Sequence, residues 1–282
     1  SGGYNTAIGW DALTANTSGQ INTALGGKAL AANTTGSENT ALGYSALERN
    51  TTASYNTAVG RTSMPFNTTG ANNTSIGFGS LYSNTTASNA TAVGYQAAYN
   101  ATTGSITAVG TRALYSQTSQ NGDTAIGKFA GYNHNGGYYL TAVGHEAAYS
   151  NSTGINNTAI GADAMRSNTT ASSNTAVGYQ SLYDNTTGAN NVSVGYQALA
   201  NNTTANYNTA FGYSSLFTNT TGTQNSASGN WSLYLNTTGN YNTAHGYEAL
   251  RGNTTASNNT AVGYKAGYNT TTAGNNAAFG DT

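Results

Sequence analysis

A repeat of 17 residues runs through the chain and limits its possible folds more than any other feature. We align the repeats on the glycine that ends the motif Asn-Thr-Ala-Ile-Gly. The aligned glycines are Gly9, Gly26, Gly43, Gly60, Gly77, Gly94, Gly110, Gly127, Gly144, Gly161, Gly178, Gly195, Gly212, Gly229, Gly246, Gly263 and Gly280. Every interval is 17 residues except the 16 between Gly94 and Gly110. A fixed period is typical of proteins in which each repeat packs on its neighbours. Because no linker or change of composition interrupts the pattern, the sequence predicts a single repeat array over residues 1–282, without separate domains.

Two rows of large apolar residues recur within this period. The residue before the glycine is Ile8, Leu25, Leu42, Val59, Ile76, Val93, Val109, Ile126, Val143, Ile160, Val177, Val194, Phe211, Ser228, His245, Val262 or Phe279. Four residues after the glycine stand Leu13, Leu30, Leu47, Met64, Leu81, Ala98, Leu114 and later Leu182, Leu199, Leu216, Leu233 and Leu250. A row of Ala or Ser precedes each of the two. Every repeat therefore carries the same two pairs of a small and a large residue.

The period, the β-branched segment and the glycine corner predict an all-β fold. Segments such as Asn-Thr-Ala-Val-Gly-Tyr alternate in the manner of a short strand, with successive side chains on opposite faces. Apolar residues do not recur at helical spacing over any useful length, which argues against a helical repeat. We therefore expect a β-solenoid, or β-roll, of about 16 stacked 17-residue coils.

Two arrangements of the coil stay open at this point. If the Ile/Val and Leu rows point inward, the solenoid has a conventional apolar core and a polar exterior. If the Ala/Ser rows point inward, the coil is thin, and the large apolar rows need a partner. Ser228 and His245 are neighbours in one of these rows, and burial inside a coil would require hydrogen-bond partners for both. This favours association, with local fraying of the row as the alternative.

Composition excludes several classes of function. Charged residues make up 6% of the chain and the formal net charge is -1, so the basic surface of a nucleic-acid-binding protein is absent. No run of about 18 apolar residues predicts a membrane span. His134, His145 and His245 fall in different rows of the repeat, without a cluster of carboxylates in the sequence. We therefore predict no catalytic residues, no metal site, no cofactor and no enzymatic activity.

The motif Asn-Thr-Ala-Ile-Gly, followed by Ala-Leu and Asn-Thr-Thr-Gly, resembles known fibre repeats, as does the segment TAVGYQ. It is similar to the repetitive shaft segments of bacterial and phage tail-fibre-like proteins. More distantly, it resembles the heads of trimeric autotransporter adhesins, which carry shorter A-I-G-x-x-A coils. The resemblance covers the whole chain. It implies a fibre on a cell or particle surface, often trimeric and built as a stacked β-roll.

Asparagine recurs in two positions of the repeat. The first lies four residues before the glycine and holds Asn5, Asn22, Asn39, Asn56, Asn73, Asn157, Asn174, Asn191, Asn208, Asn225, Asn242, Asn259 and Asn276. Nearly all are followed by Thr-Ala or Ser-Ala, which is not an acceptor sequence for N-linked glycans. Stacked amides can hydrogen-bond from one coil to the next. We interpret this row as a structural Asn ladder.

The second position lies seven residues after the glycine and follows a different pattern. It holds Asn16, Asn33, Asn50, Asn67, Asn84, Asn151, Asn168, Asn185, Asn202, Asn219, Asn236 and Asn253, each in an Asn-x-Ser/Thr triplet. Asn100 and Asn269 stand one place earlier and keep the triplet, whereas Gln117 and His134 break the row. Such triplets are acceptors for N-glycosylation on exposed loops. We predict that this row lies on an outward turn and carries glycans, with the threonines of the same turns as candidate O-linked sites. The alternative is that duplication has copied a chance triplet, and we attribute the triplets at Asn72, Asn89, Asn156 and Asn258 to chance.

The pattern predicts a structural subunit of an extracellular fibre or filament that associates with copies of itself, head to tail or laterally. The first residue, Ser1, lies within the repeat and follows no leader, so we expect a mature or truncated chain. Neither end carries a polar capping repeat, which favours stacking of copies or a fragment of a longer fibre. A trimeric adhesin shaft on a phage or cell surface is one alternative. An ice-binding β-solenoid is another, because Thr forms rows from coil to coil, although its adjacent Thr-Thr pairs point to opposite sides of an extended segment.

Overall fold

The computed structural model describes residues 2–118 and 122–280. The contacts divide the chain into two compact units, Ser1–Tyr139 and Leu140–Thr282. Both units are built from the same coil. The described residues form 17 short strands and include no helix. They therefore contain no helix that could cross a membrane.

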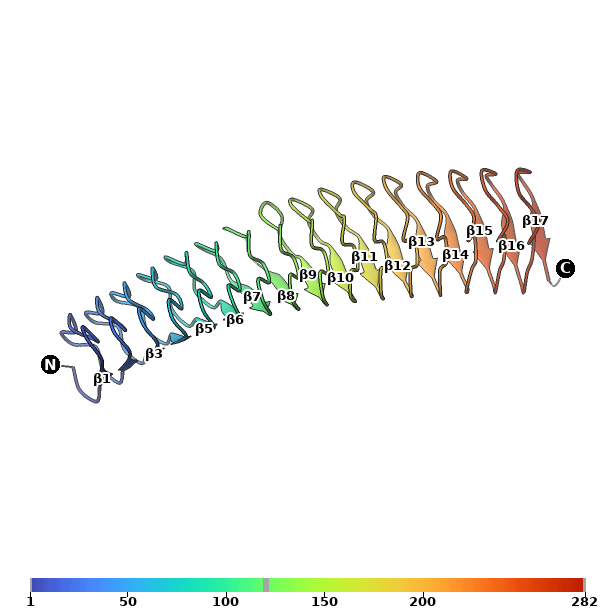
Figure 1. Cartoon of the computed structure of the whole chain (residues 1–282). Coiled ribbons are helices and arrows are strands. Elements are labelled where there is room, and N and C mark those ends of the chain that lie inside the picture. Colours follow the sequence, from blue (N-terminus) through green and yellow to red (C-terminus); the bar gives the residue numbers. More distant parts are fainter. Residues whose placement is uncertain (1, 119–121, 281–282) are drawn as a thin grey trace. The chain divides into compact units, whose positions relative to one another are not determined.

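The first unit is a stack of parallel coils with one strand each (Figure 1). Its strands are β1 (Thr6–Ile8), β2 (Thr23–Leu25), β3 (Thr40–Leu42), β4 (Thr57–Val59), β5 (Thr74–Ile76), β6 (Thr91–Val93), β7 (Ile106–Val109) and β8 (Asp123–Ile126). Each strand pairs in parallel with the next, and equivalent residues of the repeat lie opposite each other, as Thr40 and Thr57 do. The 16-residue interval keeps this register, because Thr91 lies opposite Thr107.

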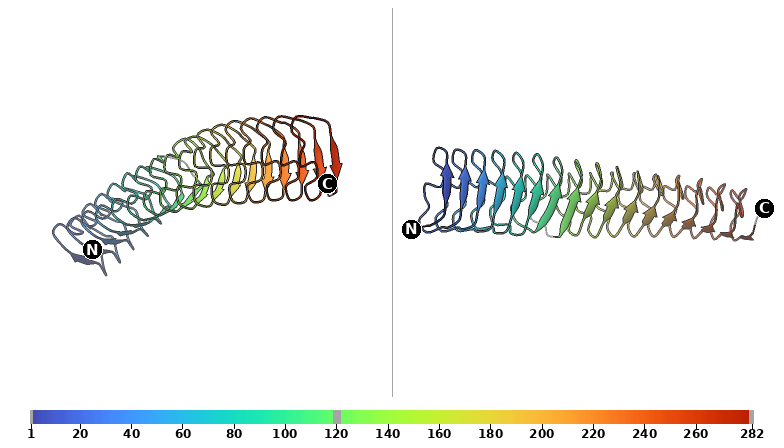
Figure 2. Two further views of the ribbon diagram at one scale, coloured as in Figure 1. Left: turned by 45° about the vertical axis from the view of Figure 1, so that its right-hand side comes forward. Right: turned by 90° about the horizontal axis from the view of Figure 1, so that it is seen from below.

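The second unit repeats this construction (Figure 2). Its strands are β9 (Thr141–Val143), β10 (Thr158–Ile160), β11 (Thr175–Val177), β12 (Val192–Val194), β13 (Thr209–Phe211), β14 (Ser226–Ser228), β15 (Thr243–His245), β16 (Thr260–Val262) and β17 (Ala277–Phe279). Neighbouring strands are again parallel and in register, with Thr158 opposite Thr175 and Ala159 opposite Ala176. The predicted all-β β-solenoid with a 17-residue coil is therefore confirmed.

The interior of a coil combines features of both arrangements that the sequence left open. In β3, Ala41 is buried while Thr40 and Leu42 on either side of it are exposed. After the glycine, the chain turns so that Ala46 and Leu47 are both fully buried. The Ala/Ser rows and the Leu row thus point inward, and the Ile/Val row points outward. A coil closed by Ala and Leu needs no partner to fill its core.

This arrangement also accounts for the two polar residues in the Ile/Val row. Ser228 and His245 end β14 and β15 at the outward position, where Ser228 is half-buried and His245 is exposed. Neither side chain enters the core. The hydrogen-bond partners that burial would have required are therefore unnecessary.

The corner that follows the strand glycine passes through two further residues with positive φ, and most of these are not glycine. After Gly43, Ser45 has a φ of 55° and Leu47 a φ of 51°. This left-handed region is uncommon for residues with a side chain. Here the N–H of Ser45 donates to the carbonyl of Gly27 in the preceding coil, and the N–H of Leu47 donates to the carbonyl of Ser63 in the following one. Hydrogen bonds to both neighbours thus hold the corner in a conformation that an isolated turn would rarely adopt.

The glycine at the end of each strand permits close stacking of the coils. Gly43 has a φ of 136°, and a Cβ atom there would lie 2.6 Å from the carbonyl carbon and oxygen of Gly60. The obstacle is backbone and cannot rotate away. This explains why the glycine is the invariant member of the repeat, since any side chain would force neighbouring coils apart.

Candidate functional site

The first Asn row forms the ladder that the sequence predicts. Asn22 Oδ1 accepts hydrogen bonds from the backbone N–H of Asn39, at 3.0 Å, and from its side-chain amide, at 3.1 Å. Asn39 Nδ2 also donates to the carbonyl of Ala53, at 2.9 Å. In the second unit, Asn174 Oδ1 accepts from the N–H of Asn191 at 2.9 Å. Each side chain in this row joins one coil to the next and ties down a corner.

The second Asn row is also buried, and the prediction that it lies on an outward turn is wrong. Asn185 Nδ2 donates to Asn168 Oδ1 at 3.0 Å and to the carbonyl of Gly188 at 2.8 Å. Its Oδ1 accepts from Asn202 Nδ2 at 2.8 Å. The row members with fully buried side chains are Asn33, Asn50, Asn67, Asn84, Asn151, Asn168, Asn185, Asn202, Asn219, Asn236 and Asn253. We call this row the inner amide ladder.

These hydrogen bonds explain the error. The sequence Asn-x-Thr suits a tight inward corner as well as a glycan acceptor, because the amide closes the corner by bonding to the carbonyl three residues ahead. A glycan on Nδ2 would replace one of its two N–H groups, both of which are used, and it would have to occupy a closed interior. The fully buried members of the inner amide ladder therefore cannot carry glycans in this fold.

Three predicted acceptors lie outside the closed interior. Asn16, in the first coil, is half-buried and still donates to the carbonyl of Gly19. Asn100 is half-buried because the one-residue shift places Ala101, which is fully buried, at the inner position. Asn269 is exposed. Glycosylation of these three residues stays a prediction.

The triplets attributed to chance occupy more accessible places. Their asparagines lie five residues before the glycine, are exposed and have positive φ, and they are Asn72, Asn89, Asn156 and Asn258. The sequence alone did not distinguish exposed triplets from buried ones. Inward or outward direction depends on the corner geometry, which the triplet does not encode.

The threonines of the Asn-Thr-Thr turns divide between two roles. Thr186 Oγ1 donates to the carbonyl of Thr203 in the following coil at 3.0 Å. The next residue, Thr187, is exposed. The first threonine of each turn therefore contributes to stacking of the coils, and the second presents its hydroxyl to solvent.

The outer face of the strands carries a polar row and an apolar row side by side. In β11, Thr175 and Val177 both point away from the buried Ala176. The apolar row is well exposed, with 42% of Leu42 and 39% of Ile160 accessible. We call the outward Thr and Ile/Val rows together the strand face. Its rows repeat once per coil in each unit.

Tyrosines five residues after the glycine stack along the first unit. The ring centroids of Tyr82 and Tyr99 are 4.7 Å apart with an interplanar angle of 3°. Those of Tyr99 and Tyr115 are 5.4 Å apart, and those of Tyr115 and Tyr132 are 5.2 Å apart. We call these four residues the tyrosine ladder. The guanidinium of Arg112 lies 5.4 Å from the centroid of the Tyr115 ring, which adds a cation–π contact.

One buried polar cluster in the first unit departs from the Asn pattern. Asp123 stands in the first Asn row, and Gln117 and His134 replace Asn in the inner amide ladder. All three are buried. Gln117 Nε2 donates to Asp123 Oδ2 at 2.8 Å, and His134 Nε2 lies 3.5 Å from Asp123 Oδ1. These three side chains thus take the place of the asparagines in joining one coil to the next. The cluster lies in the closed interior, where no substrate can reach it.

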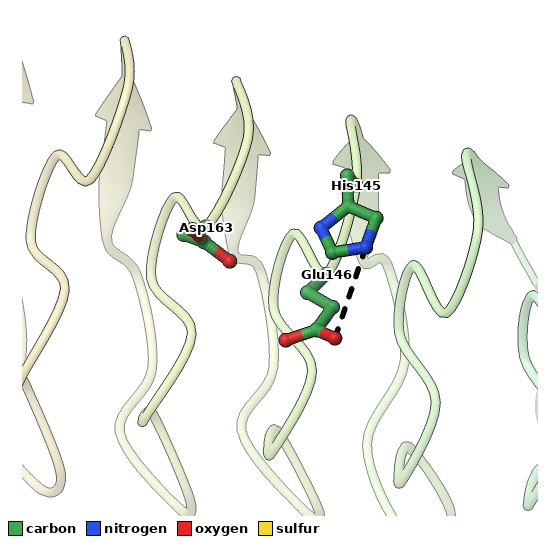
Figure 3. Close-up of side chains that lie close together, drawn as sticks. All are labelled: His145, Glu146 and Asp163. Atoms are coloured by element: carbon green, nitrogen blue, oxygen red, sulfur yellow. Dashed lines mark ion pairs between the residues drawn. The ribbon is translucent and has the colours of Figure 1, made fainter.

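A second group of titratable side chains lies on the surface of the second unit (Figure 3). The candidate ligand atoms of His145, Glu146 and Asp163 all lie within 4.8 Å of one another. Sequence analysis missed this proximity because Asp163 comes from the following coil. Arg166 Nε lies 2.6 Å from Glu146 Oε2 and 3.8 Å from Asp163 Oδ1. The hydrogen bond to Glu146 raises the pKa of the Arg166 guanidinium. A cation on these carboxylates would have to displace that guanidinium, so the cluster is better described as an ion-pair network.

Comparison of the chain with protein-family models, with curated proteins and with solved structures found no match.

Proposed function

We propose that this chain is a structural segment of an extracellular fibre and that it supplies the fibre with stiff, regular stacks of coils. The observation that carries the proposal is that the interior of each coil is filled by residues that contact the neighbouring coils. In each unit the two Asn rows, the Ala/Ser rows and the Leu row are committed to joining one coil to the next. A network in which buried polar groups are paired resists local opening. This construction suits a mechanical element.

We propose further that the strand face binds a second copy of the chain. Its exposed apolar row, exemplified by Leu42 and Ile160, is of the kind that marks interaction surfaces. The face repeats once per coil, so a second copy with the same period matches it at every coil. Charged residues are only 6% of the chain, which limits electrostatic repulsion between copies. Association of two or three copies, as in an adhesin shaft, would cover this row.

Charge placed on the strand face tests this association. We expect the double variant Val177→Lys, Val194→Lys to remain monomeric at concentrations at which the unchanged chain associates, as measured by sedimentation velocity. Thr187→Lys, an exposed residue of a corner, is the matched control and should associate normally. If the unchanged chain is monomeric at high concentration, or if the control loses association equally, the proposal fails.

Ice binding is a second candidate, favoured by one observation. In β11, Thr175 and Val177 point to the same side, so the strand face is a two-column array in each unit and not the adjacent Thr-Thr pattern considered from the sequence. Regular rows of hydroxyl and methyl groups can order water. Thermal hysteresis of the purified chain tests this candidate. Activity that Val177→Lys abolishes would support it, and an absence of hysteresis would exclude it.

A further inference from the structure

The tyrosine ladder places reactive side chains in contact from one coil to the next. Tyr82, Tyr99, Tyr115 and Tyr132 have neighbouring centroids 4.7 to 5.4 Å apart and interplanar angles of 3° to 16°. The four tyrosines lie in the turns that follow the strands. They stack because in-register pairing of the strands sets equivalent residues of neighbouring coils about 4.8 Å apart. Each phenol ring therefore has the reactive ring of another phenol directly beside it.

The ladder is open to small reagents along its edge. All four rings are half-buried, so their faces cover one another while part of each side chain reaches solvent. Burial, together with the neighbouring phenols of Tyr82 and Tyr115, raises the pKa of Tyr99. That phenol is therefore neutral at physiological pH, and no negative charge on it repels the adjacent rings.

Three other tyrosines provide an internal comparison. They are more exposed than the ladder, but the equivalent residue in each neighbouring repeat is not a tyrosine, so they have no stacked phenol beside them in their row. Tyr55, Tyr207 and Tyr241 lie five residues before their glycines and are 57%, 61% and 57% exposed. In the repeats on either side of Tyr207, the equivalent residues are Asn190 and Gln224. Reactivity governed by exposure alone would favour these residues, whereas reactivity that needs an adjacent phenol would favour the ladder.

We propose that the tyrosine ladder is a site of oxidative cross-linking, at which a one-electron oxidant of the peroxidase class joins neighbouring rings as dityrosine. Each of two phenols gives one electron to the oxidant and its hydroxyl proton to solvent. The two phenoxyl radicals then form one carbon–carbon bond between the ring carbons ortho to oxygen. The hydrogen on each coupled carbon is lost as a proton, and each oxygen regains one, which restores both aromatic rings. The net change is the loss of two electrons and two protons per bond.

The product would be a covalent link between consecutive coils. Because the partner ring is already in place, coupling should occur within one chain and compete well with collisions between chains. A link between Tyr82 and Tyr99 closes a loop of one coil, which prevents those coils from separating. This inference does not depend on the proposed self-association, since the bond forms inside a single copy.

The test is photo-oxidation of the dilute chain with a ruthenium tris-bipyridyl complex and persulfate, followed by proteolysis and mass spectrometry. We expect cross-linked peptides joining Tyr82 to Tyr99, Tyr99 to Tyr115, and Tyr115 to Tyr132. In Tyr99→Phe the ring stays but the phenol is lost, so the first two links should vanish and the Tyr115–Tyr132 link should persist. A urea-unfolded sample should lose this selectivity.

Several outcomes would overturn the inference. Links dominated by Tyr55, Tyr207 or Tyr241 would show that exposure governs the reaction. Covalent dimers in place of intramolecular links would show that the rings of one chain do not couple. An unchanged set of links in Tyr99→Phe, or the same set in the unfolded sample, would show that the ladder does not direct the coupling.

Discussion

Replacing one member of the inner amide ladder should open its coil far more than any surface change nearby. Asn185→Ala removes three hydrogen bonds, of 3.0 Å to Asn168 Oδ1, 2.8 Å to the Gly188 carbonyl and 2.8 Å from Asn202 Nδ2. At about 1 kcal/mol each, their loss costs about 3 kcal/mol. Asn168 Oδ1 is left buried without its donor, which adds about 1 kcal/mol or more. The Gly188 carbonyl keeps a bond from Asn174 Nδ2, at 2.9 Å.

The expected destabilisation is therefore about 3 to 5 kcal/mol. Repeat arrays open locally, so a single global free energy of unfolding is a poor measure of it. Hydrogen exchange of individual amides is better suited. The N–H groups of Thr186 and Thr203 bond to the following coils and report on this region. Their protection should fall by a factor of about 100 or more, since each 1.4 kcal/mol corresponds to a factor of about 10.

Thr187→Ala is the matched control, since this exposed residue stands two places away in the same turn. It should change the opening free energy by no more than about 0.5 kcal/mol. A fall of less than about tenfold in the protection of Thr186 and Thr203 for Asn185→Ala would refute the reasoning. So would equal effects of the two substitutions, because the interior hydrogen bonds would then contribute nothing specific.

Three further predictions concern the backbone, the core and a carboxyl group. Gly212→Ala should lower the opening free energy of its coil by several kcal/mol, as measured by hydrogen exchange, because its φ is 127° and the new Cβ would lie 2.8 Å from the carbonyl group of Gly229. Leu199→Ala should cost about 2 to 5 kcal/mol in the same assay, whereas Val194→Ala, on the strand face, should cost less than about 1 kcal/mol. Burial raises the pKa of Asp184, so its proton is held more tightly in the folded state. The free energy of unfolding should therefore gain a contribution as pH falls through the carboxyl range, and Asp184→Asn should remove that component from the pH profile.

The coil, its period and the first Asn row were predictable because each depends on identity between repeats. A residue type that returns every 17 positions must stack on itself, and an amide stacked on an amide can bond to it, as Asn22 and Asn39 do. The glycine was predictable for the same reason. All of these features follow from comparing equivalent positions of successive repeats.

The direction of each row was not predictable, because it depends on the path of the backbone between the rows. Leu47 and Leu42 are the same residue type, and yet one is buried and the other is 42% exposed. The turn between them passes through positive φ at Ser45 and Leu47, and neither residue type predicts this backbone conformation. The same limitation misplaced the inner amide ladder, since Asn50 turns inward at a corner whose sequence is typical of an exposed loop.

The inner amide ladder also has a direction. In both units every recorded bond within it runs the same way, from the Nδ2 of one asparagine to the Oδ1 of the asparagine one coil nearer the amino terminus, as from Asn50 to Asn33 and from Asn202 to Asn185. The amide dipoles therefore add along the row, with their positive ends toward lower residue numbers, and each bond polarises the next. Breaking the row at one asparagine leaves two shorter chains of dipoles. Two substitutions in one ladder should consequently cost a different free energy from the sum of their separate costs. Each unit also has a dipole along its stack, although the chain carries almost no net charge.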